Sequence, residues 1–388
     1  MIKNVSSNNE IQVSDYFDKK IDKRSIIKYL NYTWKMPIRY HISRDLSQWY
    51  VTTALIHIQQ ETCVRFKKEN MKIKSGNGIN FVYHKHYCGS QIGMNPNNQP
   101  QELLLNYQCM YDLIRIQTTV FRALGMIHEQ CRTDRDSFVT IHNKSITSGF
   151  ESNFQMDIYG YSETYNISYD YGSIMQSFST AFSKDGKPTI TSKISSKYEE
   201  MMGQRATIAF SDYKLINLHY CKNNCSNTIV CQNDGYQDPN SCRKCKCIHN
   251  FEGIKCDYPK VTVYRCGMYT RIATPKIQLL NPWGSTDCYY KIKSSEDKRV
   301  GINIAYVNAH YEKLCHDKYG VEVKHRKDKA VMGLCLCGIH YGPNYLLSED
   351  NTVLVHHIGW RLWHQIKVNY VEVERNATID DLKKIFKA

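Results

Sequence analysis

The segment from Thr118 to Asp136 reads TTVFRALGMIHEQCRTDRD and contains part of a pattern that binds zinc. Such a site places two histidines four residues apart on one face of a helix, and a glycine then turns the chain toward a third histidine. A glutamate beside the first histidine accepts a proton from the metal-bound water, whose pKa the zinc lowers. Here Gly125 fits the turn, and His128 fits the third ligand position.

The remaining positions of the pattern carry other residue types. Counting back from Gly125, the two other ligand positions are Thr118 and Arg122, and the general-base position is Thr119. A single imidazole does not hold zinc at useful affinity, because affinity comes from several preoriented ligands and the groups behind them. We therefore expect zinc to be absent or only weakly bound at His128.

Residues 25–222 resemble the astacin family of zinc metallopeptidases along their whole length. Six segments carry the resemblance in the family's order: WKMPIRYHIS (34–43), VTTALIHIQQETCVRF (51–66), INFVYHKHYCGSQIG (79–93), HEQCRTDRD (128–136), SYDYGSIMQSFSTAFS (168–183) and GQRATIAFSDYKLINLHYC (203–221). The resemblance implies an α+β, metzincin-like peptidase domain with two lobes. It also implies zinc as the family's cofactor and cleavage of extracellular proteins as the family's activity.

A second family motif, Ser-x-Met-His-Tyr, is present here as SIMQS (173–177). Met175 matches the methionine of the family's turn beneath the metal. Gln176 replaces the histidine, and Ser177 replaces the tyrosine that steadies the oxyanion. Together with the three substitutions before Gly125, five positions important to catalysis differ from the family's pattern. Because loss of a general base alone typically costs about 100- to 10,000-fold in rate, we expect a catalytically inactive homologue.

The resemblance also gives Glu129 a role, since it matches a family position that binds the new amino terminus after propeptide removal. Lys23-Arg24 offers a dibasic cleavage point before Ser25, and residues 1–24 are expected to be an N-terminal extension or propeptide remnant. The charged residues that follow resemble a structural charge cluster of the family: Arg132, Asp134, Arg135 and Asp136.

Other residues offer alternatives around the altered zinc pattern. His84 and His86 in YHKHYC are candidates for a relocated metal site, although a structural role is the more common one for such a pair. The guanidinium of Arg122 can take the place of the cation, by pairing with a carboxylate or by donating to peptide carbonyl oxygens. The opposite alternative is that Arg122 points into solvent.

The chain has 16 cysteines, and their clustering indicates an oxidising compartment. The dense run from Cys225 to Cys256 is too short to bury a sufficient core and resembles an EGF-like module over 223–257. A structural zinc site is the alternative for this run. The EGF resemblance implies three bridges, and the astacin resemblance implies two more: Cys225–Cys242, Cys231–Cys245, Cys247–Cys256, Cys63–Cys221 and Cys88–Cys109.

Residues 262–375 show period-two alternation in short segments, which predicts an all-β sandwich. Cys266-Gly267, NPWGSTDCYYKI and GLCLCG resemble a CUB domain, followed by a tail at 376–388. This resemblance implies a Cys266–Cys288 bridge and a second bridge from Cys315 to either Cys335 or Cys337. The other cysteine of that pair and Cys131 are then expected to remain without a disulfide. We expect no calcium binding, because Lys318 or Tyr319 stands where calcium-binding CUB domains carry an aspartate.

The net charge of +14 favours acidic partners such as sulfated glycans, and no nucleic-acid-binding motif accompanies it. No apolar run is long enough for a transmembrane helix, and the first residues lack the apolar core of a signal peptide. Six Asn-x-Ser/Thr sequons are compatible with a glycoprotein: Asn4, Asn31, Asn143, Asn166, Asn224 and Asn376. We expect a secreted, extracellular protein.

Three functional hypotheses follow from these observations. The first is a binding protein, a decoy or regulator, in which the cleft between the lobes holds an extended peptide or protein segment without cutting it. The second is an active zinc-dependent endopeptidase, which the overall resemblance favours and the site residues oppose. In the third, the EGF-like and CUB-like modules bind the partner and the first domain is a scaffold.

Overall fold

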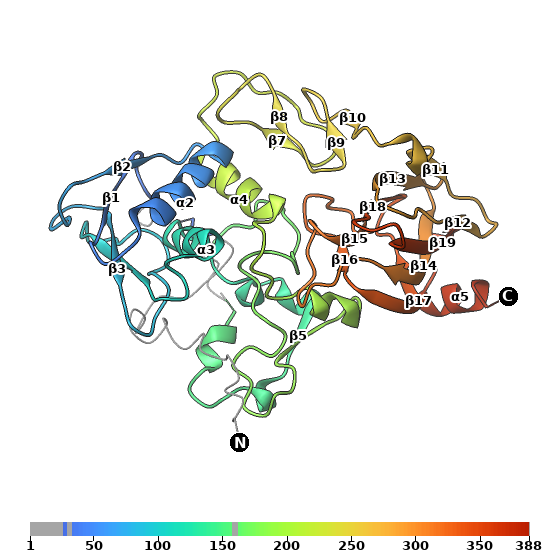
Figure 1. Ribbon diagram of the computed structural model, residues 1–388, viewed down its shortest axis with the longest axis horizontal. Helices are drawn as coiled ribbons and strands as arrows, with labels where there is room; N and C mark the ends of the chain where they lie inside the picture. Colours follow the sequence, from blue (N-terminus) through green and yellow to red (C-terminus); the bar gives the residue numbers. More distant parts are fainter. Residues whose placement is uncertain (1–25, 29–32, 157–161, 388) are drawn as a thin grey trace. The chain divides into compact units, whose positions relative to one another are not determined.

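The computed structural model describes residues 26–28, 33–156 and 162–387 (Figure 1). The predicted extension 1–24 and the cleavage point before Ser25 lie outside these residues. The chain forms two compact units. The first unit is Met1–Arg135, Thr147–Tyr165 and Leu215–Asn224; the second is Asp136–Ile146, Asn166–Lys214 and Cys225–Ala388.

The first unit is built on a four-stranded parallel sheet with the order β2-β1-β3-β4. Its strands and helices are β1 (Ile38–Ile42), β2 (Phe66–Lys68), β3 (Ile79–Tyr83), β4 (Gln101–Leu105), α2 (Gln48–Glu61) and α3 (Leu113–Ala123). Buried and partly exposed residues alternate along β1, as a half-buried strand requires. Helix α2 packs against α3, and α3 packs against β4.

Helix α3 carries Thr118, Thr119 and Arg122, the three residues predicted at altered zinc-site positions, and has well-defined ends. The Asp112 carboxylate accepts hydrogen bonds from the backbone N–H groups of Ile114 and Arg115 and caps the first turn. The helix ends before Gly125, whose φ of +104° disfavours any residue with a side chain. The predicted turn glycine is therefore at the point where the chain leaves the helix.

Two side chains hold the end of α3 in place. The indole Nε1 of Trp34 donates to the Ala123 carbonyl at 2.7 Å, and the Tyr220 hydroxyl donates to the Leu124 carbonyl at 2.6 Å. Tyr220 comes from the end of α4 (Phe210–Tyr220). Both bonds satisfy carbonyl groups that the helix end would otherwise leave unpaired.

The second unit begins with a region of short elements. Strands β5 (Val139–Ile141) and β6 (Ile190–Ser192) pair antiparallel. The described 3-10 helices of both units are η2 (Glu129–Cys131), η3 (Arg135–Ser137), η4 (Asn143–Ser145), η5 (Glu151–Phe154), η6 (Ser196–Glu200) and η7 (Tyr264–Cys266).

A small disulfide-rich module follows in the second unit. It contains two antiparallel ribbons, formed by β7 (Tyr236–Gln237) with β8 (Cys245–Lys246) and by β9 (Phe251–Glu252) with β10 (Tyr258–Pro259). Three bridges hold it: Cys225–Cys242, Cys231–Cys245 and Cys247–Cys256.

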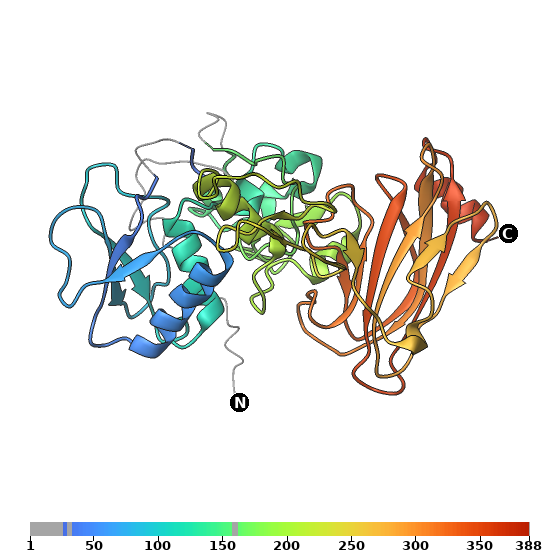
Figure 2. The same cartoon turned by 90° about the horizontal axis from the view of Figure 1, so that it is seen from above.

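The C-terminal part is a β-sandwich, whose two sheets face each other in Figure 2. One sheet has the order β11-β13-β18-β15-β16 and the other β12-β19-β14-β17. The strands are β11 (Thr270–Ile272), β12 (Gln278–Leu280), β13 (Asp287–Lys293), β14 (Arg299–Asn308), β15 (Gly320–Lys324), β16 (Leu334–Leu336), β17 (Ile339–Leu347), β18 (Thr352–Ile358) and β19 (Gln365–Val373). Their inward side chains form the core, and Ile302, Val323, Val355 and Val368 are fully buried.

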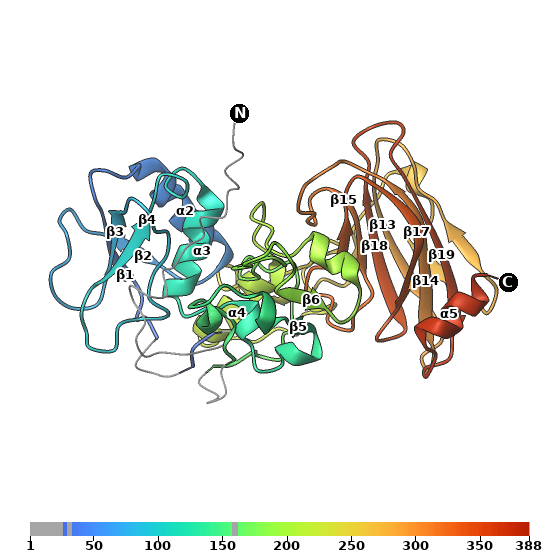
Figure 3. The same cartoon turned by 90° about the horizontal axis from the view of Figure 1, so that it is seen from below.

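The sandwich contains the bridges Cys266–Cys288 and Cys315–Cys337. Cys335 lies inside β16 and is buried without a disulfide. The predicted tail contains helix α5 (Ile379–Ile385, Figure 3), which begins with a capping box at Thr378. Leu382 of this helix is fully buried against Val371 and Val373, so this end of the chain belongs to the folded sandwich.

A buried histidine joins the sandwich to the region of short elements within the second unit. His325 Nδ1 lies 2.9 Å from the Leu347 carbonyl, and His325 Nε2 lies 2.9 Å from the Tyr198 hydroxyl. Because a carbonyl only accepts, Nδ1 carries the proton and Nε2 accepts from Tyr198. Burial lowers the pKa of His325 to about 4.

This pKa predicts acid sensitivity. Folding depresses the pKa of this histidine, so its neutral form stabilises the protein. This contribution is fully present at a pH above the pKa of histidine in the unfolded chain. It is lost as the pH falls from that pKa toward the lower pKa of the folded protein. Between pH 7.5 and 4 the wild type should lose about 3 kcal/mol of unfolding free energy more than a His325→Asn variant. Urea unfolding of both proteins at several pH values measures the difference. Parallel pH profiles would contradict it.

No helix in the described part of the chain is long and apolar enough to span a membrane.

Candidate active site

The hydroxyl groups at two of the altered positions bond to their own helix. Thr118 Oγ1 donates to the Ile114 carbonyl at 2.8 Å, and Thr119 Oγ1 donates to the Arg115 carbonyl at 2.8 Å. Thr119 is buried, and the Cys88 sulfur lies 3.9 Å from its hydroxyl. Such bonds to the carbonyl four residues earlier are the usual behaviour of threonine within a helix.

Arg122 is half-buried and bonded to the neighbouring chain. Its Nε donates to the Ser90 carbonyl at 2.9 Å, and the Ser90 hydroxyl in turn donates to the Thr119 carbonyl at 3.1 Å. The guanidinium thus donates to a carbonyl oxygen of the chain itself. This contact disagrees with the alternative in which Arg122 points into solvent.

His128 lies beyond the turn, half-buried, directly before the short helix η2. Its carbonyl accepts the Cys131 N–H at 3.0 Å and so begins that helix. Throughout the described residues, one group of three or more His, Cys, Asp or Glu side chains could hold a metal ion, and His128 does not belong to it.

His84 and His86, the candidates for a relocated metal site, do not belong to that group of possible metal ligands either. Strand β3 ends at Tyr83, so both histidines lie in the following loop. His84 Nδ1 accepts backbone N–H groups of His86 and Tyr87 at 3.2 and 3.0 Å, and its ring stacks on Tyr87. These contacts support a role for His84 in shaping the loop.

Glu129 is buried beside a fully enclosed arginine. Arg132 lies 3.4 Å from the Glu129 carboxylate and 2.7 Å from that of Asp134, and its side chain is 2% exposed. Arg135 is also buried and donates to the Gln130 carbonyl at 2.6 Å. A buried guanidinium between carboxylates is costly to disrupt, because loss of one partner leaves a charge uncompensated.

The predicted partner of Glu129, the amino group of a processed Ser25, lies outside the described residues. The next two residues are buried in the first unit. Ile26 forms a bridge with Met126, and the Ile27 N–H donates to the Gly125 carbonyl at 3.0 Å. This segment therefore lies along the turn that leads from α3 to His128.

The predicted methionine turn around Met175 belongs to the second unit and is ordered by an aspartate. Met175 is fully buried, and its N–H donates to the Ser173 hydroxyl at 3.0 Å. That hydroxyl donates to Asp212 at 2.6 Å, and the Ile174 N–H donates to the same carboxylate at 3.0 Å. Burial and the neighbouring Asp170 raise the pKa of Asp212 to about 7.

Gln176 and Ser177 follow Met175 and are both buried. The side-chain oxygen Oε1 of Gln176 accepts a hydrogen bond from the Tyr169 hydroxyl at 2.5 Å. Its side-chain nitrogen Nε2 donates to the backbone carbonyl of Ser177 at 2.9 Å. Glutamine supplies an acceptor and a donor for this arrangement, so it has a structural use at a position where the family pattern has histidine.

The group that could hold a metal, His249, Glu322 and His356, was not anticipated from the sequence. Its members lie far apart along the chain and in no short motif. The only local signal is the histidine pair His356-His357 in a strand whose other residues are mostly apolar.

Comparisons with known proteins agree with the astacin-like pattern. A family model described as Astacin, a peptidase family, matches residues 26–221. The chain is 33% identical over 343 residues to zinc metalloproteinase nas-34 of Caenorhabditis elegans, covering 87% of this chain and 55% of that protein. It is 35% identical over 331 residues to zinc metalloproteinase dpy-31 of the same organism, covering 81% of this chain and 54% of that protein.

A solved structure similar to part of the chain is high choriolytic enzyme 1, a hatching enzyme zinc-protease from the medaka fish Oryzias latipes. It is 29% identical with a TM-score of 0.43, and the match covers 55% of this chain and 98% of that chain. This chain thus spans about half the length of the two nematode relatives. From the family model and the identity to these relatives, the chain belongs to the astacin family of peptidases.

Proposed function

We propose that this chain is a secreted astacin-family protein that binds extracellular peptides or proteins without cleaving them, as a decoy or regulator. The observation that carries the proposal is the donor set on α3. The hydroxyl groups of Thr118 and Thr119 bond to their own helix, and Arg122 is a cation bonded to Ser90. These groups do not replace imidazole ligands and a carboxylate base. The family's zinc therefore does not fit this site.

The edge of the first unit's sheet supports a binding role. Strand β4 is the last of the four parallel strands, and Gly89 pairs with Leu104 in an antiparallel bridge. Because Gly89 occupies the β4 edge at Leu104, an extended peptide would lie along the outer side of the segment around Gly89. There it would gain main-chain hydrogen bonds, while neighbouring side chains select its sequence. The Cys88–Cys109 bridge and the Arg122–Ser90 bond hold the chain on either side of Gly89, which lowers the cost of ordering it.

The other modules support an extracellular role. We assign residues 25–222 to the astacin-like domain, 223–257 to an EGF-like module and 262–375 to a CUB-like domain, with 376–388 after it. The five bridges between Cys225 and Cys337 fit these assignments. Disulfides of this density persist in secreted proteins.

The alternative is an active zinc-dependent endopeptidase of extracellular proteins. Its support is that the nematode relatives are named zinc metalloproteinases. Against it stand the threonines and the arginine on α3, because a peptidase of this kind needs a metal-activated water and a base.

A peptide-capture experiment distinguishes the binding role from the peptidase role. The purified protein is incubated with peptides from unfolded casein, isolated by gel filtration, and its bound peptides are sequenced by mass spectrometry. We expect intact bound peptides whose termini match the input, with or without a chelator. New termini that disappear with chelator, and in a His128→Ala control, would favour the peptidase. Absence of any bound peptide would contradict the binding role.

A further inference from the structure

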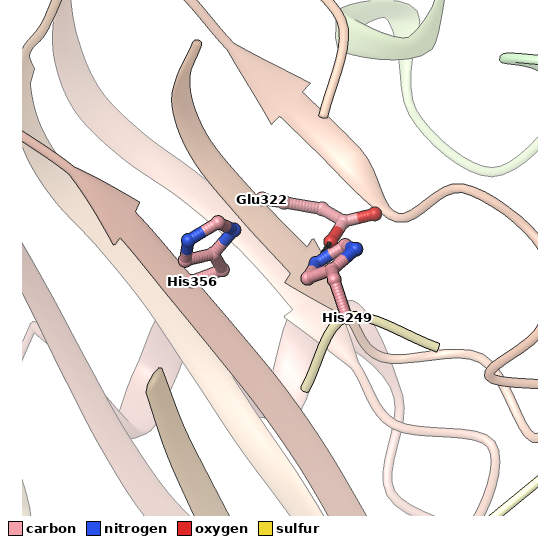
Figure 4. A group of neighbouring side chains, drawn as sticks. All are labelled: His249, Glu322 and His356. Atoms are coloured by element: carbon pink, nitrogen blue, oxygen red, sulfur yellow. Dashed lines mark ion pairs between the residues drawn. The ribbon is translucent and has the colours of Figure 1, made fainter. Parts of the chain in front are cut away.

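Three side chains converge at the junction between the disulfide-rich module and the sandwich (Figure 4). His249 comes from the module, Glu322 from β15 and His356 from β18. One ligand atom from each lies within 4.8 Å of the others. All three belong to the second unit and lie outside the segments that define the astacin pattern.

Strand register brings two of them together. Glu322 stands directly opposite His356 in the β15–β18 ladder, and Tyr289 stands opposite His356 on the other side, in β13. Residues opposite one another in a ladder share a face of the sheet with their Cβ atoms about 5 Å apart. The His356 ring stacks on Tyr289 with centroids 4.1 Å apart, which fixes its orientation.

Packing of the disulfide-rich module against the sandwich positions the third side chain, His249. Ile248 and Phe251 are buried in one cluster with Leu354 of the sandwich. Leu354 is two residues before His356 and therefore lies on the same face of β18. His249, between the two module residues, is thus held over the row that contains His356.

The polar atoms of this cluster lack a full set of partners. His356 Nδ1 is buried and has no hydrogen-bond partner. His249 Nε2 and Glu322 Oε2 are buried as well, and the contact between them is an ion pair at 2.7 Å. Because buried polar groups are normally hydrogen-bonded, an orphaned ring nitrogen beside a buried ion pair calls for a further partner.

The opposite sides of the same groups are occupied. Glu322 Oε1 accepts the Gly333 N–H at 2.8 Å and lies 3.0 Å from Lys324 Nζ. His356 Nε2 lies 2.6 Å from the Asp287 carboxylate, and His249 Nδ1 lies 3.9 Å from that of Asp317. A metal-binding histidine typically has a carboxylate or carbonyl on its other nitrogen, and both rings here have a carboxylate on that side.

We propose that His249 Nε2, Glu322 Oε2 and His356 Nδ1 bind a Zn²⁺ ion that fastens the disulfide-rich module to the sandwich. Two imidazoles and one carboxylate suit zinc, with a fourth position for water, whereas calcium and magnesium select oxygen ligands. Ligands about 2.0–2.1 Å from a tetrahedral zinc lie about 3.3 Å apart. The His249–Glu322 pair therefore has to open by roughly 0.6 Å, which a side-chain adjustment supplies.

The local charges favour a divalent cation. Around the cluster, the three carboxylates of Glu322, Asp287 and Asp317 outnumber the one ammonium group, that of Lys324.

Zinc titration of the chelator-stripped full chain tests the proposal. We expect one equivalent to bind, to raise the melting temperature, and to be replaceable by Co²⁺ with the visible absorption of a tetrahedral site. His249→Gln removes a ligand from a partly exposed position and should weaken zinc binding more than 100-fold, beyond the effect typical of an outer-shell change. His310→Gln, an exposed histidine of the same sandwich, is the control and should change nothing.

Asp287→Asn provides a second variant that keeps all three ligands. Because the Asp287 side chain is 59% exposed, the substitution should leave the fold intact. It should weaken zinc binding about 10- to 100-fold through His356. Failure of the stripped wild type to bind zinc would overturn the proposal and leave an ion pair between His249 and Glu322. Binding that His249→Gln and Asp287→Asn leave unchanged, or that His128→Ala abolishes, would overturn it as well.

Discussion

The variant T118H/T119E/R122H is expected to bind zinc at His128 at least about 1,000-fold more tightly than the unchanged chain. Positions 118 and 122 lie one turn apart on the same face of α3, and the Gly125 turn is present to direct His128 toward them. Complete zinc sites supply about 10–16 kcal/mol of binding free energy, of which a 1,000-fold gain uses only about 4. The three substitutions also remove the cationic guanidinium that opposes a metal.

Isothermal titration with zinc measures this gain, with His249→Gln in the background so that the second proposed site does not contribute. T119E alone is the matched control, because it restores the base position without adding an imidazole. An unchanged affinity in the triple variant would show that the first unit does not bring positions 118, 122 and 128 together. The explanation of the lost metal site would then be wrong.

Removal of the Cys63–Cys221 bridge, by C63S/C221S, should cost about 5 kcal/mol of unfolding free energy. The bridge closes a loop with a sequence separation of 158, and its loss restores the corresponding entropy to the unfolded chain. It also joins the ends of α2 and α4, the helix whose Tyr220 holds the end of α3. The variant should therefore also loosen the segment around Gly125.

Urea unfolding compares this variant with C131S. Cys131 forms no disulfide, and its sulfur donates to the Asn153 carbonyl at 3.2 Å. Loss of that contact should cost no more than about 1 kcal/mol. Equal losses in the two variants would show that the long bridge contributes little beyond local packing.

Features with a fixed spacing could be predicted from the sequence. Counting back from Gly125 and His128 predicted that Thr118, Thr119 and Arg122 lie on one helix, and the structure places all three on α3. Local alternation likewise predicted the C-terminal sandwich. The position of a residue on a helix and the alternation of residues along a strand both follow from backbone periodicity. A short stretch of sequence is enough to recognise that periodicity.

Features that depend on tertiary register could not be predicted. Cys335 and Cys337 are equivalent by spacing, but Cys335 lies within β16 opposite Glu322, while Cys337 follows the strand and bonds to Cys315. The bond from Arg122 to Ser90 depends on a loop from another part of the chain. The cluster of His249 with Glu322 and His356 needs both a ladder register and a docked module, which no local pattern encodes.

Whether the first unit binds zinc and cleaves protein is decided by the zinc content and proteolytic activity of the full chain carrying H249Q and H356Q, purified in the presence of zinc. We expect background zinc and no chelator-sensitive cleavage of a denatured protein, because α3 carries two threonines and an arginine at the positions predicted for the other ligands and the base. One equivalent of zinc together with chelator-sensitive cleavage, both lost on adding H128A, would contradict this expectation.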